Sequence, residues 1–265
     1  MEEPLHAGAT GAPDLTLPRT SLLATASAQG PQGEGPGRLR SALLALVVTL
    51  TGALALASLS APYLARLGIG EGVADSAINF VTHSLFILGG IVMIRASGLR
   101  MPRLSPFPRK RGGHNLRRFA IIATPFALVA VATDLAPPFT KVSMSPLGWA
   151  LTLLFQGVFV GWSEEFLFRA ALQNILNQRF SGGRTIFRMR RGTFVASVVF
   201  GAVHLGNAFL GQSVSSAAGE AAFALAFAFA VGWYYEKTQD LAGAAWIHNA
   251  TDGLGTFATF LFSVL

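Results

Sequence analysis

The chain places three charged side chains inside a long apolar region, in the segment SEEFLFR at residues 163–169. The region around it, about Leu147 to Leu176, is otherwise rich in large apolar residues. Inserting a charged side chain into hydrocarbon costs roughly 2.5–3.5 kcal/mol, so a chain that keeps Glu164, Glu165 and Arg169 there has a use for them. We therefore expect a membrane protein with a buried functional site.

The composition agrees with a membrane protein. The 265-residue chain is 52% hydrophobic and 12% charged, whereas soluble domains carry about 25% charged residues. Its 20 Lys and Arg against 13 Asp and Glu leave a net charge of +7, which lies in loops between apolar segments. This placement argues against a nucleic-acid binder, which gathers basic side chains on one folded face. The absence of cysteine excludes disulfides, a thiolate nucleophile and cysteine-ligated zinc.

Apolar segments long enough to cross a membrane follow a tail of different composition. Residues 1–37 are rich in Gly, Pro, Ala, Ser and Thr and predict a flexible tail, so the membrane domain covers residues 38–265. The expected spans lie at about Ser41–Ala65, Ser76–Ile94, Phe119–Ala136, Leu147–Leu176, Thr193–Leu210, Ala217–Tyr235 and Leu241–Val264. We predict an all-α, polytopic membrane helical bundle of about seven to eight transmembrane helices.

The fourth span is longer than one crossing needs. About thirty helical residues extend about 45 Å, against about 30 Å of hydrocarbon. This segment either tilts, extends into the cytoplasm, or breaks near Gly161 into two elements, which would raise the number of helices. Basic residues concentrate in the loops at residues 95–118 and 179–191, which we assign to the cytoplasm. With seven crossings the tail then lies inside and the C-terminus outside.

The charged segment contains two glutamates with different expected roles. Glu165 and Arg169 are four residues apart and share a helix face, whereas Glu164 projects about 100° away. Arg169 can pair with Glu165 and leave Glu164 as the freer carboxylate, which suits a general base that takes a proton from water. The same charges also suit a structural ion network, and the segment alone leaves this alternative open. Asn79 and His83 in the second span are expected to form an interhelical hydrogen-bond pair.

Two later histidines lie at depths where they can meet Glu164. His204 and His248 fall, like Glu164, near the midplane or in the cytoplasmic half of the expected topology. Phe200 lies one turn before His204, and Asp252 lies four residues after His248 on the same helix face. A lone histidine in an apolar helix is more often a packing residue, but a carboxylate beside an imidazole can set its tautomer or share a metal.

These residue types permit two hydrolytic chemistries. Glu164 can activate water while His204 and His248 stabilise the oxyanion or protonate the leaving group. Alternatively, His204, His248 and a carboxylate can bind Zn²⁺ with an open position for water. The usual helical zinc-protease motif, HExxH, is absent. The residues themselves do not decide between the two routes.

Three motifs together resemble those of a known family. EExxxR begins at Glu164, FxxxH ends at His204 and HxxxD begins at His248, in the order and spacing of the CPBP family. This family comprises CAAX prenyl proteases and bacteriocin-processing or bacteriocin-immunity proteins, also called Abi-like. The resemblance covers about residues 147–265, whereas the first half of the chain matches only as apolar spans.

The resemblance implies an α-helical intramembrane endopeptidase with a conical cavity open to the cytosolic side. Carried over by motif, Glu164 would activate water, His204 would assist it, and His248 with the last residue of its motif would hold the oxyanion. Glu165 and Arg169 would support this arrangement. Family members are often named metalloproteases, yet the best-understood CAAX proteases look like glutamate-dependent, metal-free enzymes.

One position departs from the family pattern, because the third motif commonly ends in Asn and here ends in Asp252. An ionised Asp cannot donate a hydrogen bond to an oxyanion, so Asp252 is expected either to be protonated and orient His248 or to be a metal ligand. The expected catalytic residues are Glu164, Glu165, Arg169, His204, His248 and Asp252. If a metal such as Zn²⁺ is bound, its expected ligands come from Glu164, His204, His248 and Asp252.

We therefore expect an intramembrane endopeptidase of a bacterial inner membrane, with its active site toward the cytoplasmic side. Its partners would be membrane lipid and a peptide or protein substrate, with or without a lipid, in CAAX-type or bacteriocin-precursor processing. The alternative is a non-proteolytic scaffold or bacteriocin self-immunity protein of the same fold. A proton-coupled transporter would also need buried Glu and His, but transporters favour internal repeats that these spans do not display.

Overall fold

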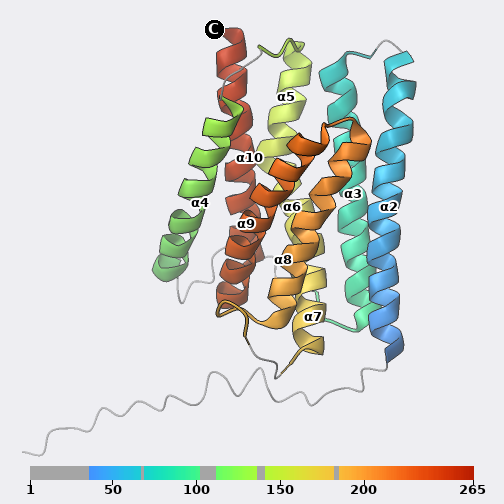
Figure 1. The fold of residues 1–265 in the computed structure, drawn as a ribbon, viewed down its shortest axis with the longest axis vertical. Helices are drawn as coiled ribbons and strands as arrows, with labels where there is room; N and C mark the ends of the chain where they lie inside the picture. The colour runs from blue at the N-terminus through green and yellow to red at the C-terminus, as the bar shows by residue number, and fades with distance from the viewer. Residues whose placement is uncertain (1–35, 67–68, 102–111, 136–140, 182–184) are drawn as a thin grey trace, which may run out of the picture. The chain divides into compact units, whose positions relative to one another are not determined.

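The computed structural model describes residues 36–66, 69–101, 112–135, 141–181 and 185–265. These residues form a helical bundle whose long helices run side by side (Figure 1). The elements are α2 (Pro36–Arg66), α3 (Glu71–Ser97), α4 (Gly112–Asp134), a helical run from α5 to α7 (Pro146–Arg179), α8 (Arg191–Val203) with η4 (His204–Leu210), α9 (Val214–Thr238) and α10 (Leu241–Val264). The predicted tail up to residue 35, the basic loop at 102–111 and the expected stop at Pro137-Pro138 lie outside the described residues.

Each segment that the sequence predicted as a span is helical over its described residues, except that α4 ends at Asp134, two residues before the predicted end at Ala136, which lies outside the described residues. Five of the described helical stretches are long and apolar enough to cross a membrane, and they lie in α2, α3, α4, α8 with η4, and α9. The predicted class, a polytopic helical bundle of the membrane, is therefore confirmed. The number of crossings stays a prediction, since the run from α5 to α7 and α10 are not among these five stretches.

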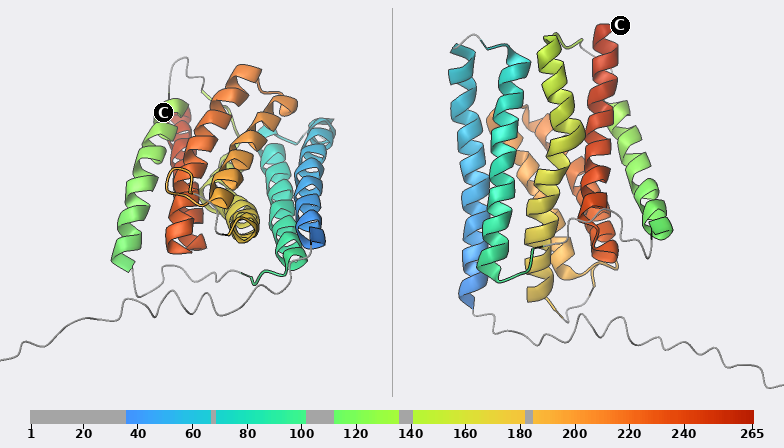
Figure 2. Two further views of the ribbon diagram at one scale, coloured as in Figure 1. Left: turned by 60° about the horizontal axis from the view of Figure 1, so that its bottom comes forward. Right: turned by 180° about the vertical axis from the view of Figure 1, so that it is seen from behind.

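The fourth predicted span is one continuous helical run with two π-helical parts. It consists of α5 (Pro146–Leu154), η2 (Phe155–Phe159), α6 (Val160–Glu165), η3 (Phe166–Gln173) and α7 (Asn174–Arg179), and Figure 2 shows it extending along the bundle. Ser145 caps its start by accepting a hydrogen bond from the Gly148 N–H. The run does not break at Gly161, so that alternative was wrong. π-helical turns occur often at functional sites, and η3 begins directly after Glu165.

This run lies inside the bundle and packs against α3, α8 and α10. Its side chains Leu167, Phe168 and Leu172 are buried. On the outside, α2 packs on α3 and α4 packs on α10. Large apolar side chains such as Leu44 on α2 and Leu128 on α4 are exposed, as helices that face lipid require. The charged segment of the sequence is thus enclosed by the other helices.

Candidate active site

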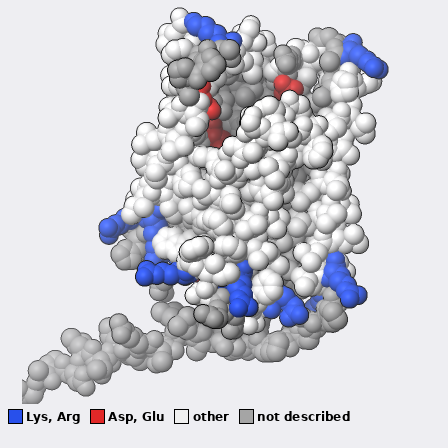
Figure 3. Space-filling view, in the orientation of Figure 1, with Lys and Arg blue, Asp and Glu red and all other residues white. Residues whose placement is uncertain are grey.

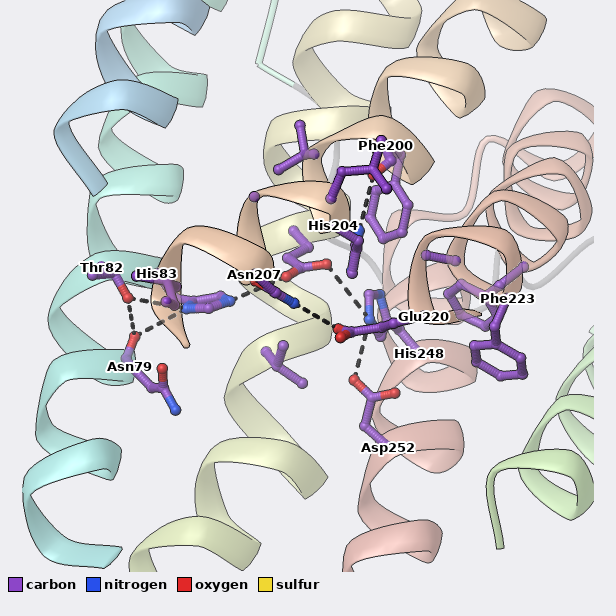
Figure 4. A pocket seen from close by; sticks show the side chains of 18 of the residues that line it. Asn79, Thr82, His83, Phe200, His204, Asn207, Glu220, Phe223, His248 and Asp252 are labelled. Carbon is purple, nitrogen blue, oxygen red and sulfur yellow. Dashed lines mark hydrogen bonds and ion pairs between the residues drawn. The ribbon is translucent and has the colours of Figure 1, made fainter. Parts of the chain in front are cut away.

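The predicted site residues come from three parts of the bundle and meet around one cavity. Glu164 and Glu165 end α6, Arg169 lies in η3, His204 begins η4, and His248 and Asp252 lie on α10. The cavity has a volume of about 990 Å³ (Figure 4). Of the six predicted residues, those that line it are Glu164, His204, His248 and Asp252. Glu165 and Arg169 are fully buried. Glu165 contacts the lining residue His248, and Arg169 contacts Glu165.

Arg169, Glu165 and His248 form a buried chain of polar contacts. Arg169 Nε donates to Glu165 Oε2 at 2.8 Å, and His248 Nδ1 donates to Glu165 Oε1 at 2.9 Å. The Arg169 guanidinium also lies 5.2 Å from the centre of the Phe200 ring, a cation–π contact that gives the phenylalanine of the FxxxH motif a role. The predicted pairing of Glu165 with Arg169 is confirmed, and it fixes the orientation of the His248 ring.

Glu164 lies between two imidazoles, of which the sequence analysis anticipated only one. Its Oε1 is 3.1 Å from His83 Nε2, and its Oε2 is 3.7 Å from His248 Nε2. His83 comes from α3, and its Nδ1 donates to the Asn79 carbonyl oxygen at 3.0 Å. The expected interhelical hydrogen bond is therefore confirmed for His83, whose partner is Glu164, whereas the contact of Asn79 with His83 lies within α3. The sequence feature that could have indicated the contact with Glu164 is a histidine in an apolar span, because such a side chain needs a polar partner on a neighbouring helix.

The three cavity histidines share one hydrogen-bonding pattern. Each places Nδ1 against an oxygen that only accepts: Asn79 O for His83, Phe200 O for His204 at 2.9 Å, and the Glu165 carboxylate for His248. Nδ1 therefore carries the hydrogen in each ring, and a neutral ring has an unprotonated Nε2. Nε2 becomes a donor only when the ring is an imidazolium. The hydrogen bond between His83 Nε2 and Glu164 thus requires one further proton, held at either atom.

Asp252 faces the same imidazole from one turn further along α10. Its Oδ2 is 3.3 Å from His248 Nε2, and its side chain is 30% exposed. An ionised carboxylate only accepts hydrogen bonds. This geometry allows Asp252 to orient His248 and to balance its charge.

Asn249 joins α10 to α6 and was not anticipated as a site residue. Its Oδ1 accepts from the Gly161 N–H at 2.8 Å, and its Nδ2 donates to the Val158 carbonyl oxygen at 2.9 Å. A Cβ at Gly161 would lie 2.5 Å from the Ala245 carbonyl oxygen and 2.8 Å from His248 Cβ. The missing side chain of Gly161 therefore permits the close approach that brings Glu164 to His248.

The predicted metal ligands do not form a metal-binding group in the described part of the chain. No set of three or more His, Asp and Glu residues there is arranged to hold a metal ion. The Nδ1 atoms of His204 and His248 are engaged by Phe200 and Glu165, and Asp252 and Glu164 both approach the one remaining nitrogen of His248. These contacts leave Nε2 of His204 and of His248 as the ring nitrogens without a backbone or Glu165 partner, as in histidines that bind a metal through one nitrogen and donate from the other, so zinc binding stays a prediction.

Fold and site together define an integral membrane protein with a buried glutamate–histidine cluster on a cavity wall. Residues 146–254 match the model of the Rce1-like family, which is described as type II CAAX prenyl endopeptidase Rce1-like. The match contains all three sequence motifs and confirms the family that they indicated. No curated protein and no solved structure matches the chain. His83 lies outside the matched residues, so this partner of Glu164 comes from a part of the chain that the family model does not cover.

Proposed function

We propose that the chain is an intramembrane endopeptidase that hydrolyses peptide bonds with a water molecule activated by Glu164. The observation that carries this proposal is the Glu164 carboxylate on the cavity wall with an imidazole beside each of its oxygens. The family match supports the reaction class, because its description names endopeptidases. The plasma (inner) membrane is the proposed location.

The reaction begins when Glu164 accepts a proton from water and the water oxygen attacks the carbonyl carbon of the scissile peptide bond. His248 in its imidazolium form donates from Nε2 to the oxyanion of the tetrahedral intermediate. Three carboxylates lie within 3.7 Å of its ring nitrogens and balance its charge. The proton on Glu164 then passes to the leaving nitrogen as the C–N bond breaks, which yields a carboxylic acid and an amine.

The other residues of the cluster act through these two. Arg169 holds Glu165, and Glu165 holds the His248 Nδ1 hydrogen. His83 is a positioning residue, because its Nε2 restrains Glu164 Oε1 while Asn79 restrains its Nδ1. His204 lines the cavity and presents Nε2 to it, where it assists the water. The substrate is a peptide or protein segment, with or without a lipid.

The test is cleavage of a peptide panel by purified protein in detergent, with products identified by mass spectrometry. The panel contains prenylated CAAX peptides, the same peptides without the lipid, and precursor-type peptides with internal cleavage sites. Wild type should yield defined internal cuts, and Glu164→Gln should yield none while its melting temperature stays close to that of wild type. A folded wild-type protein that cleaves nothing in the panel would favour the non-proteolytic scaffold or immunity protein instead.

A further inference from the structure

Most polar side chains on the cavity wall already have partners within the protein. The wall is built from α2, α3, α4, the helical run from α5 to α7, the end of α8, η4, α9 and α10. Figure 3 shows a hollow in which acidic side chains lie among uncharged ones. Asn207 donates to Glu220 at 2.8 Å. Four threonines of the wall donate their hydroxyl hydrogens to carbonyl oxygens of their own helices, namely Thr51, Thr82, Thr133 and Thr251.

Two amide side chains of the wall differ from these groups. Asn79 and Gln156 both line the cavity, and their side chains bond to no other described residue. Asn79 is engaged through its backbone oxygen, which accepts from Thr82 and His83. A side-chain amide carries two donor hydrogens and an acceptor oxygen. Each of these two residues can therefore pair with both the N–H and the C=O groups of a peptide chain in the cavity.

The helices that carry the two amides lie side by side and run in the same direction. Ser76 Oγ on α3 is 3.1 Å from Thr152 Oγ1 on α5. Further along both helices, His83 Nε2 is 3.1 Å from Glu164 Oε1. Because the contacts advance along both chains in the same order, residues that precede His83 and residues that precede Glu164 lie on the same side of the catalytic carboxylate.

Asn79 and Gln156 both lie on that side, at different distances from the reacting bond. Asn79 is one turn before His83 on α3 (Figure 4), about 6 Å along the helix axis. Gln156 is two turns before Glu164, about 12 Å along the run, and Val160 between them also lines the cavity. An extended peptide advances about 3.3 Å per residue. The amides therefore lie beside substrate positions about two and about three to four residues from the scissile bond.

We propose that Asn79 and Gln156 bind the backbone of the substrate and hold it extended past Glu164. This inference rests on the proposed function, since it assigns substrate-binding residues to the same site. The N–H and C=O groups of a peptide lose water when they enter a cavity and need new partners there. Amides supply these partners whatever side chains the substrate carries. The site thus selects an extended chain, and it tolerates different sequences at the positions beside the two amides.

Ester analogues of a cleaved peptide test the backbone contacts. Each analogue replaces one peptide bond other than the scissile one by an ester, which removes a single N–H donor. Wild type should lose about three- to tenfold in kcat/KM, chiefly through KM, for esters about two to four residues from the cut and on one side of it only. Uniform rates for all ester analogues would overturn the inference.

The two amide variants should reproduce this loss on the unmodified peptide. Asn79→Leu and Gln156→Leu should each raise KM about three- to tenfold with a smaller effect on kcat. Each variant should also become insensitive to the ester at the position that the lost amide contacted, because one hydrogen bond cannot be removed twice. Full additivity of the variant and ester effects at every position would contradict the proposed contacts.

Thr133→Val is the matched control, because Thr133 lines the same cavity but its hydroxyl already donates to the Val129 carbonyl oxygen. It should stay within about threefold of wild type in kcat/KM. Neither leucine variant removes a side-chain hydrogen bond within the described part of the chain, so both should keep the melting temperature of wild type. A clear drop in melting temperature in both would assign the amides a structural role and overturn the inference.

Peptide binding separates this inference from the proposed function. Fluorescence anisotropy of labelled panel peptides with Glu164→Gln protein requires no cleavage. Binding that depends on Asn79 and Gln156, in a protein whose wild type cleaves nothing, would sink the proposed function alone. Cleavage with a KM indifferent to both leucine substitutions would sink the inference alone. A protein that binds none of the labelled peptides would overturn the inference as well.

Discussion

Gly161→Ala should inactivate the site without removing any charged group. A β-carbon at this position would lie 2.5 Å from the Ala245 carbonyl oxygen and 2.8 Å from His248 Cβ. Favourable contacts between such atoms begin at about 3.5 Å, so α6 and α10 would have to separate by roughly 1 Å. A misplacement of about 1 Å can cost about a hundredfold in rate. We expect a loss of this size, because Glu164 lies on α6 and His248 on α10.

The assay is kcat/KM on a cleaved peptide, measured beside the melting temperature in detergent. Gly157→Ala is the matched control, because Gly157 lies about one turn earlier and a β-carbon there meets nothing within 4 Å. The control should stay within about threefold of wild type, whereas Gly161→Ala should also be destabilised by about 1–3 kcal/mol. Equal activity in the two alanine variants would refute the argument that this close approach holds the site together.

Three further predictions concern the cluster itself. His83→Phe should lower kcat by about ten- to hundredfold, because a hydrogen bond to a charged group contributes about 1.5–3 kcal/mol. His83→Gln, which can still donate a hydrogen bond to Glu164, should recover part of this loss. A His83→Phe variant with the kcat of wild type would show that His83 does not position Glu164. Arg169→Met should destabilise the protein by about 3–5 kcal/mol, because it leaves the buried Glu165 carboxylate without its arginine partner. Adding Glu165→Gln to this variant should restore much of the melting temperature. An Arg169→Met single variant as stable as wild type would contradict the stabilising role of this buried pair. Chelation should leave cleavage unchanged, because the proposed water activation needs only Glu164, whereas a loss that zinc restores would assign a metal to the site.

The helices were predictable because lipid imposes a simple length rule. Each span needs about 20 apolar residues, and the runs at Ser76–Ile94 and Ala217–Tyr235 were recognised within a few residues of α3 and α9. The fourth span was harder, since a glycine inside a long run permits either a break or continuous helix. The structure has a continuous helix there, and Asn249 accepts a hydrogen bond from the Gly161 N–H. That contact joins residues far apart in the chain, so no local pattern contains it.

The site was predictable where one helix carries both partners. Glu165 and Arg169 are four residues apart and pair as helix geometry requires. His83 was missed as a partner of Glu164 because their contact depends on the way α3 packs on the central run. A polar side chain in an apolar span signals that a partner exists. Which partner it finds is a property of the packed bundle.

The central claim is that Glu164 activates the water, and its most direct test compares two glutamate variants of the same cavity wall. Glu164→Gln and Glu220→Gln both replace a cavity-lining carboxylate with an amide, but only Glu164 lies between His83 and His248. On a neutral peptide, Glu164→Gln should lower kcat by about 10²–10⁴-fold or more, as loss of a general base does, while Glu220→Gln stays within about tenfold of wild type. Substantial cleavage by a folded Glu164→Gln variant would contradict the mechanism.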